Sequence, residues 1–96
     1  MKKNTAEIKA MIADLKKLDT DNMYLNDFFH TWKESDDEIA AVFEVAEILR
    51  GMRENNISSK VFDSGLGISV FRDNSTRTRF SFASACNLLG LEVQDL

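Results

Sequence analysis

The sequence predicts an α/β fold in which a helix-rich N-terminal part is followed by a βαβ unit with an incomplete parallel sheet. Apolar residues recur at helical spacing in two segments before residue 55. From Ile68 onward, an apolar run, a polar loop, an amphipathic segment and a second apolar run follow one another. This order, strand, loop, helix and strand, is that of a βαβ unit, whose strands should be parallel and whose crossover should be right-handed.

Size and composition describe one small globular domain. The chain has 96 residues, of which 44% are hydrophobic and 29% charged, and its formal net charge is -4 at pH 7. These proportions are ordinary for a soluble globular chain. The acidic balance argues against a nucleic-acid partner, because proteins that bind nucleic acids usually neutralise phosphates with a basic face.

The first residues and the cysteine content indicate a cytoplasmic protein. Met1, Lys2 and Lys3 lead into a polar and then amphipathic stretch, which is unlike a signal peptide or a membrane span. The only cysteine, Cys86, cannot form an internal disulfide and lies among apolar residues, so we expect a buried small hydrophobe. We therefore expect a cytoplasmic protein with no membrane partner.

The first helix should cover residues 5 to 18. Asn4 and Glu7 have the spacing of a capping box, in which each side chain pairs with the backbone of the other residue. The apolar residues that share one face of this helix are Ile8, Met11, Ile12, Leu15 and Leu18. We expect this face to pack in the core, although it could also pack on another subunit.

A turn-forming cluster at 19–22 leads into an aromatic-rich segment, Met23 to Trp32, whose periodicity favours neither helix nor strand. We expect Phe28, Phe29 and Trp32 to anchor this connection to the core.

The second helix should begin after Ser35 and end near Asn55. Ser35 and Glu38 form a stronger capping box, and the acids of the first turn suit the helix dipole. These acids, Asp36 to Glu38, indicate a helix start rather than a metal site, because neighbouring acids on a helix do not converge. The predicted core face consists of Ile39, Val42, Phe43, Ala46, Leu49 and Met52.

The βαβ unit should follow a segment, 57–62, that fits a short strand or a connector equally well. Turn residues at 63–67 precede the first predicted strand, 68–71, and the helix should begin near Phe80. Gly90 suits the C-terminal cap of this helix, after which Leu91 and Val93 begin the second strand. The helix face predicted to be apolar contains Phe82, Ala85, Cys86 and Leu89.

A parallel sheet normally has several strands and both faces covered, whereas this sequence offers two strands. We therefore expect residues 1–96 to be the N-terminal piece of a longer protein and to form a partial domain. Its expected parts are an N-terminal helix with its connection, 1–34, and the helix-strand-loop-helix-strand segment, 35–96. Association that protects an exposed strand edge is the other possibility.

The polar loop of the βαβ unit, Asn74 to Arg79, has the chemistry of an anion site. Backbone N–H groups at a helix start are unpaired and carry partial positive charge. Serine and threonine add hydrogen-bond donors, and arginine adds a planar fork that holds two phosphate oxygens. A polar helix cap with solvated arginines is the commoner meaning of such a cluster, so both interpretations remain open.

The segment Phe71-Arg72-Asp73-Asn74-Ser75-Thr76-Arg77-Thr78-Arg79 resembles the carbamoyl phosphate-binding signature of the aspartate and ornithine carbamoyltransferases. The family pattern is Phe, any residue, Glu or Lys, any residue, Ser, Gly or Thr, Arg, Thr, and only Asp73 departs from it. This departure and the sequence of residues 61–74 look most like the knotted, YgeW-like branch of the family. The resemblance continues through 79–82 and 89–93 and reaches back to the helix at 36–53.

The resemblance implies a transferase that moves a carbamoyl group between phosphate and an amino or ureido nitrogen, with no metal and no organic cofactor. Ser75, Thr76, Arg77 and Thr78 match the positions that hold the phosphate of carbamoyl phosphate in the family. We expect Arg79 to be a structural partner that points away from Arg77, because two residues apart on a helix do not face each other.

The resemblance also implies parts that this sequence lacks. In the family, a His-Pro-x-Gln motif polarises the carbamoyl carbonyl, a second domain binds the acceptor, and a neighbouring subunit of a homotrimer completes the site. The only histidine, His30, is not followed by proline, and we assign it no catalytic role. We therefore expect the chain alone to be inactive, with an acceptor that the sequence does not identify. The alternative is a non-enzymatic helical interaction module with a phosphate-binding helix start.

Overall fold

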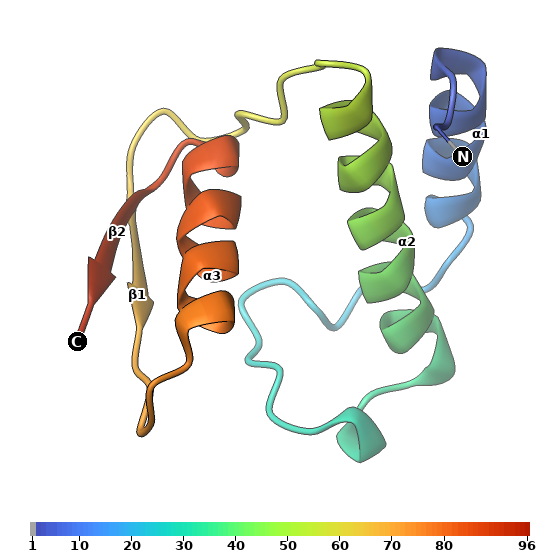
Figure 1. Cartoon of the computed structure of the whole chain (residues 1–96). Helices are drawn as coiled ribbons and strands as arrows, with labels where there is room; N and C mark the ends of the chain where they lie inside the picture. The colour runs from blue at the N-terminus through green and yellow to red at the C-terminus, as the bar shows by residue number, and fades with distance from the viewer. Residues whose placement is uncertain (1) are drawn as a thin grey trace. The chain divides into compact units, whose positions relative to one another are not determined.

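The computed structural model describes residues 2–96, which form the predicted α/β fold with three α-helices, a short 3-10 helix and two strands (Figure 1). The residues group into two compact units. The first unit ends at Ile57 and contains helices α1 and α2, and the second runs from Ser58 to Leu96 and contains the βαβ unit.

Helix α1, Thr5–Leu15, begins as predicted and ends three residues early. The Asn4 side chain accepts a hydrogen bond of 2.8 Å from the backbone N–H of Glu7, which is one half of the predicted capping box. After Leu15 the chain tightens, because the N–H of Lys17 bonds the carbonyl of Asp14 and that of Leu18 bonds Leu15. Such i to i+3 bonds end an α-helix, so the predicted end at residue 18 was wrong.

Helix α2, Asp36–Glu54, has the predicted start and end. Both bonds of the capping box are present: the N–H of Glu38 donates to Ser35 Oγ at 3.1 Å, and the N–H of Ser35 donates to Glu38 Oε1 at 2.8 Å. The helix ends at Asn55, and Asn56 follows in the left-handed region with φ 55°. Asparagine tolerates this conformation better than most residues with a side chain.

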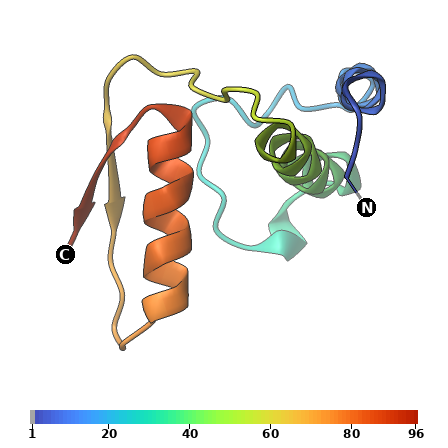
Figure 2. The same cartoon turned by 45° about the horizontal axis from the view of Figure 1, so that its top comes forward.

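The face of α2 that is buried differs from the predicted one. The buried residues of α2 are Ala41, Ile48 and Gly51, and α1 lies alongside α2 in both views (Figures 1 and 2). A Cβ at Gly51 would lie 3.1 Å from Ile8 Cγ1, so α1 approaches where the α2 side chains are small. Val42 and Phe43, which belong to the predicted face, are 45% and 70% exposed. The buried face of α2 therefore follows its small residues, glycine and alanine, where α1 can pack closely. The spacing of large apolar residues in the sequence does not predict this face.

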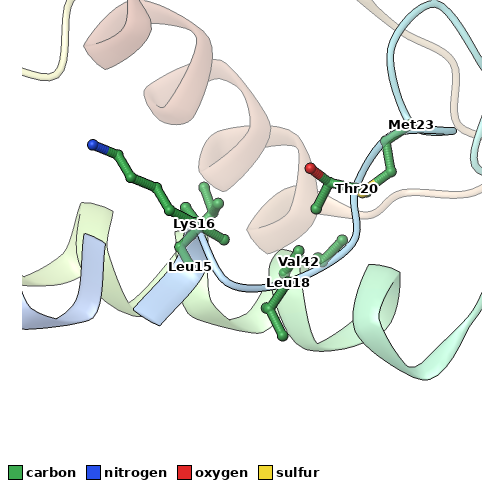
Figure 3. Close-up of a pocket in the computed structure, with 8 residues that line it drawn as sticks. Leu15, Lys16, Leu18, Thr20, Met23 and Val42 are labelled. Atoms are coloured by element: carbon green, nitrogen blue, oxygen red, sulfur yellow. The ribbon is translucent and has the colours of Figure 1, made fainter. Parts of the chain in front are cut away.

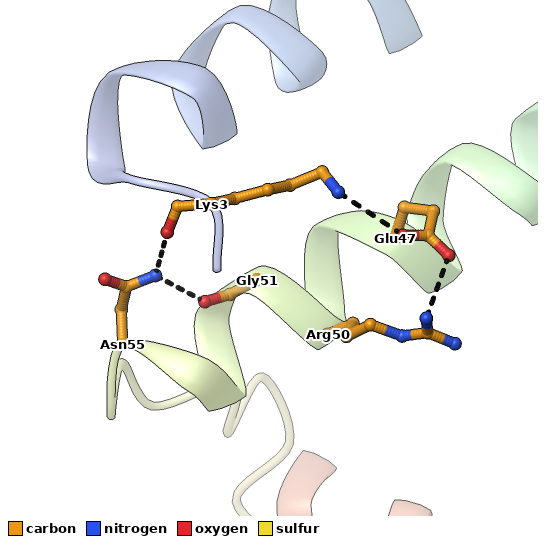
Figure 4. A network of polar contacts seen from close by, with 5 residues as sticks. All are labelled: Lys3, Glu47, Arg50, Gly51 and Asn55. Carbon is orange, nitrogen blue, oxygen red and sulfur yellow. Dashed lines mark hydrogen bonds and ion pairs between the residues drawn. The ribbon is translucent and has the colours of Figure 1, made fainter. Parts of the chain in front are cut away.

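Polar contacts attach the segment before α1 to the C-terminal half of α2 (Figure 4). Lys3 Nζ lies 3.5 Å from Glu47 Oε2, and Arg50 pairs with the same carboxylate at 3.7 Å. The Asn55 side-chain amide donates to the carbonyl of Lys3 at 2.6 Å and to that of Gly51 at 2.8 Å. These bonds fix the segment at the end of α2.

The aromatic-rich segment does not anchor the connection to the core, and this prediction was wrong. Phe28, Phe29 and Trp32 are 47%, 73% and 77% exposed. In the preceding turn, the N–H of Asp19 donates to Asp37 Oδ2 at 2.9 Å, and the other hydrogen bonds of the turn are local. Within the aromatic-rich segment itself, regular structure begins only with the 3-10 helix η1, Thr31–Lys33. A segment without a helix or strand presents no common face to a core. His30 stacks on Trp32 with ring centroids 4.3 Å apart.

The second unit contains the predicted βαβ arrangement. Strands β1, Leu66–Ser69, and β2, Glu92–Asp95, pair in parallel, with Leu66 opposite Glu92 and Ser69 opposite Asp95. Strand β1 lies two residues earlier than predicted. Gly67 in this strand permits a close approach of α3, since a Cβ there would lie 2.5 Å from Cys86 Sγ. Cys86 is buried, as predicted.

Helix α3, Thr76–Leu89, connects the two strands and begins four residues before the predicted start at Phe80. It ends as predicted at Gly90, which adopts the left-handed conformation with φ +101°. The N–H of Gly90 bonds the carbonyl of Asn87, and the N–H of Leu91 bonds that of Cys86. This pair of bonds is a Schellman motif, which turns the chain directly into β2.

The segment before β1 is a connector rather than a strand. Its chain contacts the end of α3, where the N–H of Phe62 donates to the carbonyl of Leu89 at 3.0 Å and Ser59 Oγ donates to that of Leu88 at 3.1 Å.

Across residues 2–96, no helix has both the length and the apolar character needed to cross a membrane.

Candidate functional site

The four predicted site residues line one hollow at the start of α3. The loop after β1 delivers the chain to Ser75, and α3 begins at Thr76. The hollow has a volume of about 330 Å³, and its lining residues are Asn74, Ser75, Thr76, Arg77 and Thr78. It therefore lies beyond the carboxyl end of a parallel strand, where open α/β sheets commonly bind ligands.

Backbone N–H groups of the first helical turn supply donors to this hollow. The first helical hydrogen bond of α3 runs from the N–H of Arg79 to the carbonyl of Ser75 at 2.8 Å. The N–H groups of Thr76, Arg77 and Thr78 precede that bond and have no partner within the helix. They lie at the positive end of the helix dipole, which favours an anion.

The side chain of Ser75 does not cap its own helix. Asn4 and Ser35 each accept a hydrogen bond from the third residue of the helix that follows, whereas Ser75 makes no side-chain cap hydrogen bond. The simpler interpretation of the polar cluster, a helix cap, therefore does not describe Ser75 in this structure. Its hydroxyl and the unpaired backbone groups remain available to a ligand.

The charge in the first turn of α3 also suits an anion. No acidic residue occurs in the first turn of α3, whereas α1 has Glu7 and α2 has three acids there. An anion at α3 would thus meet no repelling carboxylate from the first turn of its own helix.

The two arginines of the first turn differ in their surroundings. Arg77 is exposed, and it belongs to none of the ion pairs found within residues 2–96. The Arg79 side chain is 33% exposed, and its Nε lies 3.7 Å from Asp95 Oδ2. Residues two apart on an α-helix project about 200° from each other, which separates the two side chains. Arg77 is therefore free to bind an anion, and Arg79 has the structural partner that was expected.

A larger pocket in the first unit has the wrong chemistry for a phosphate. It has a volume of about 520 Å³ and is lined mainly by apolar side chains of α1, α2 and the turn between them (Figure 3). Lys16 is the only cation among its lining residues, and its side chain extends away from the other labelled residues. A phosphate placed there would lose its hydration without gaining charged partners.

Sequence reasoning missed a second hollow of about 370 Å³ beside the candidate site. Its lining residues are Ser69, Thr76, Arg79, Phe80, Ala83, Val93 and Asp95, so it shares Thr76 with the first hollow. Ser69 and Asp95 end the two strands. The predicted parallel pairing could have identified Ser69 and Asp95, because the carboxyl ends of parallel strands meet at one edge of a sheet.

Comparisons with known proteins find similar sequences over most of the chain. A family model described as "Aspartate/ornithine carbamoyltransferase, carbamoyl-P binding domain" matches residues 26–96. The Escherichia coli K12 protein named "Putative carbamoyltransferase YgeW" is 56% identical over 89 residues, which are 93% of this chain and 22% of that protein. The Pisum sativum protein named "Aspartate carbamoyltransferase 1, chloroplastic" is 35% identical over 69 residues, which are 72% of this chain and 18% of that protein. The chain thus spans about a fifth of the length of these relatives.

Proposed function

Because this chain belongs to the aspartate/ornithine carbamoyltransferase family, matched through its carbamoyl-phosphate binding domain, we propose that the start of α3 holds the phosphate of carbamoyl phosphate. The observation that carries this proposal is the combination of an uncapped helix start with an unpaired arginine inside the matched region. Both features supply what a phosphate needs, namely donors and positive charge.

The four residues have complementary roles in the proposed site. Ser75, Thr76 and Thr78 donate hydrogen bonds to phosphate oxygens through their hydroxyl or backbone groups. Arg77 pairs with phosphate oxygens through its guanidinium fork, which binds two oxygens at once. The first-turn N–H groups add the field of the helix dipole.

The proposed reaction is the transfer of the carbamoyl group to an amino or ureido nitrogen, or the reverse. The nitrogen lone pair attacks the carbamoyl carbon, the bond from that carbon to the phosphate oxygen breaks, and the nitrogen loses a proton. Phosphate leaves with the electron pair of the broken bond, and Arg77 stabilises the charge that grows on its oxygens. Binding and positioning both substrates carries much of the catalysis, so no covalent nucleophile is needed.

Other parts of the proposal concern the whole protein. The acceptor, an amino or ureido compound, would bind outside the residues of the phosphate site. We also propose a homotrimer in the cytoplasm that uses neither a metal nor an organic cofactor. The support for these points is membership of the family, and none of them depends on a contact within residues 2–96.

Replacing Arg77 tests the proposal directly. In the intact protein that carries this chain, Arg77→Ala should weaken carbamoyl phosphate binding by roughly tenfold to a hundredfold, because a hydrogen bond to a charged group contributes about 1.5–3 kcal/mol. Isothermal titration calorimetry with carbamoyl phosphate, or with the stable analogue phosphonoacetate, measures the change.

The matched control is Arg53→Ala, which removes the same charge from the last turn of α2. This variant should bind as the wild type does. Equal affinity of the wild type and the Arg77→Ala variant would disprove the assignment of the site.

A further inference from the structure

We propose that Arg79 is a positioning residue for the phosphate site and that it acts through Asp95. The pair holds the first turn of α3 against the carboxyl ends of both strands. This inference rests on the proposed function, because what it positions is the proposed phosphate site.

The carboxylate of Asp95 joins three elements of the second unit. Its Oδ1 accepts a hydrogen bond of 2.8 Å from Ser69 Oγ, and its Oδ2 lies 3.7 Å from Arg79 Nε. Ser69 is the last residue of β1, Asp95 is the last residue of β2, and the two are register partners. One side chain thus connects both strand ends with the first turn of α3.

The surroundings of Arg79 restrict the direction of its side chain. Its Nε is buried, and within residues 2–96 this atom has no hydrogen-bond partner, so the Asp95 carboxylate is its compensating charge. The guanidinium carbon lies 5.5 Å from the ring centroid of Phe71, a distance at which a cation is attracted to an aromatic face. Phe71 stands at the start of the loop that leads to the site, so Arg79 contacts both that loop and the end of β2.

The backbone of Arg79 explains why its placement matters for the phosphate. The N–H of Arg79 makes the first helical hydrogen bond, to the carbonyl of Ser75, and thereby orients the free N–H groups of residues 76–78. A side chain that holds this turn in place also holds the donors in place. Displacements of about 1 Å in a binding site can reduce activity strongly, so the anchor should affect affinity.

Electrostatics and positioning make opposite predictions for Asp95. If the charge alone mattered, removing the negative charge of Asp95 near an anion site would strengthen phosphate binding. If Asp95 positions Arg79, the same change releases the helix start and weakens binding. The variant Asp95→Asn therefore separates the two explanations.

The experiment measures carbamoyl phosphate affinity and melting temperature for Arg79→Gln, Asp95→Asn and the double variant, each in the intact protein. Each single variant should weaken binding by about threefold to thirtyfold, and the double variant should bind no more weakly than Arg79→Gln alone, because the two residues act through one contact. Arg79→Lys should restore part of the affinity. Arg53→Gln is the control for the lost charge and should bind as the wild type does.

The outcomes distinguish this inference from the proposed function. Wild-type or stronger binding by Asp95→Asn, or additive losses in the double variant, would overturn the positioning role while leaving the phosphate site intact. The role would also be overturned if a variant melted at a lower temperature but, at temperatures well below its melting point, bound carbamoyl phosphate with unchanged affinity. If Arg77→Ala binds as the wild type does, the proposed function itself fails. Should the Asp95 variant not fold, Ser69→Ala removes only the hydroxyl that donates to Asp95, and unchanged affinity in it would count against the inference.

Discussion

Gly67 and Cys86 set the distance between β1 and α3. A methyl group at residue 67 would lie 2.5 Å from Cys86 Sγ and 3.6 Å from Cys86 Cβ. The first distance is far below van der Waals contact, whereas the second is ordinary contact. The sulfur atom alone is therefore what excludes a side chain from position 67.

This geometry predicts a rescue between two substitutions. Gly67→Ala should destabilise the chain by about 1–3 kcal/mol, because overpacking forces side chains or backbone to shift. Adding Cys86→Ala should recover part of that loss, since the clashing atom is gone. Urea unfolding of the wild type, both single variants and the double variant measures the coupling. Additive losses would show that the helix moves away instead.

The sequence located the candidate site residues because they are consecutive. Ser75 to Thr78 need no tertiary information to lie together, and the motif identified them directly. Asp95 lies sixteen residues beyond Arg79 and is brought to it only by the return of the chain through β2. The sequence also did not identify Gly51 as a packing residue, because its role depends on the Ile8 side chain, which packs against it from a distant part of the chain.

At the scale of the elements, a serine directly precedes both α2 and α3, and the two serines serve different purposes. Ser35 accepts a hydrogen bond from the N–H of Glu38, whereas Ser75 makes no such bond with its own helix. The first serine stabilises its helix, and the second leaves its helix start open. The same residue type thus marks a structural start in one helix and a candidate ligand site in the other.

Alanine at these two positions should produce opposite effects. Ser35→Ala should lower the free energy of unfolding by about 1 kcal/mol, the usual cost of losing a cap, and should leave phosphate affinity unchanged. Ser75→Ala should leave stability nearly unchanged and weaken carbamoyl phosphate binding. Chemical unfolding and calorimetry on both variants check this. A stability loss in Ser75→Ala equal to that in Ser35→Ala would support the interpretation of Ser75 as a cap.

Helix starts were predictable where a cap made them visible. The capping-box spacings at Asn4 and Ser35 gave correct starts, whereas Ser75 is followed three residues later by Thr78 rather than Glu or Gln, and α3 was predicted to begin at Phe80 instead of Thr76. The polar residues 76–79 look like a loop in the sequence, although they form the first turn. Because Ser75 makes no side-chain cap hydrogen bond, this turn is open to a ligand.

For the whole molecule, the number of buried residues limits stability. Within residues 2–96, the buried hydrophobic residues are Ile8, Ala41, Ile48 and Cys86. Many large apolar side chains are exposed, among them Phe43, Val61, Val70 and Phe80. A two-stranded sheet also leaves both of its edges unpaired. These features are those of a chain that gains little from burial.

We therefore expect the 96-residue chain by itself to be marginally stable. It should melt over a broad temperature range and increase the fluorescence of a hydrophobic dye before melting. Circular dichroism at several protein concentrations, combined with the dye measurement, checks this. A sharp, concentration-independent transition of a monomer without dye binding would contradict the expectation.

The contact between the connector and the end of α3 determines where the chain tolerates insertions. Ser59 and Phe62 donate hydrogen bonds to the last carbonyls of α3, and the carbonyl oxygen of Phe62 would clash with a Cβ at Gly90. The connector before β1 thus caps the C-terminal end of α3, although α3 comes later in the chain. Extra residues between Ser59 and Phe62 would disturb both bonds, although this stretch has no regular structure. The turn at 21–25, in which every residue except Met23 is exposed, has only local bonds and is the better place to add a label or a peptide tag.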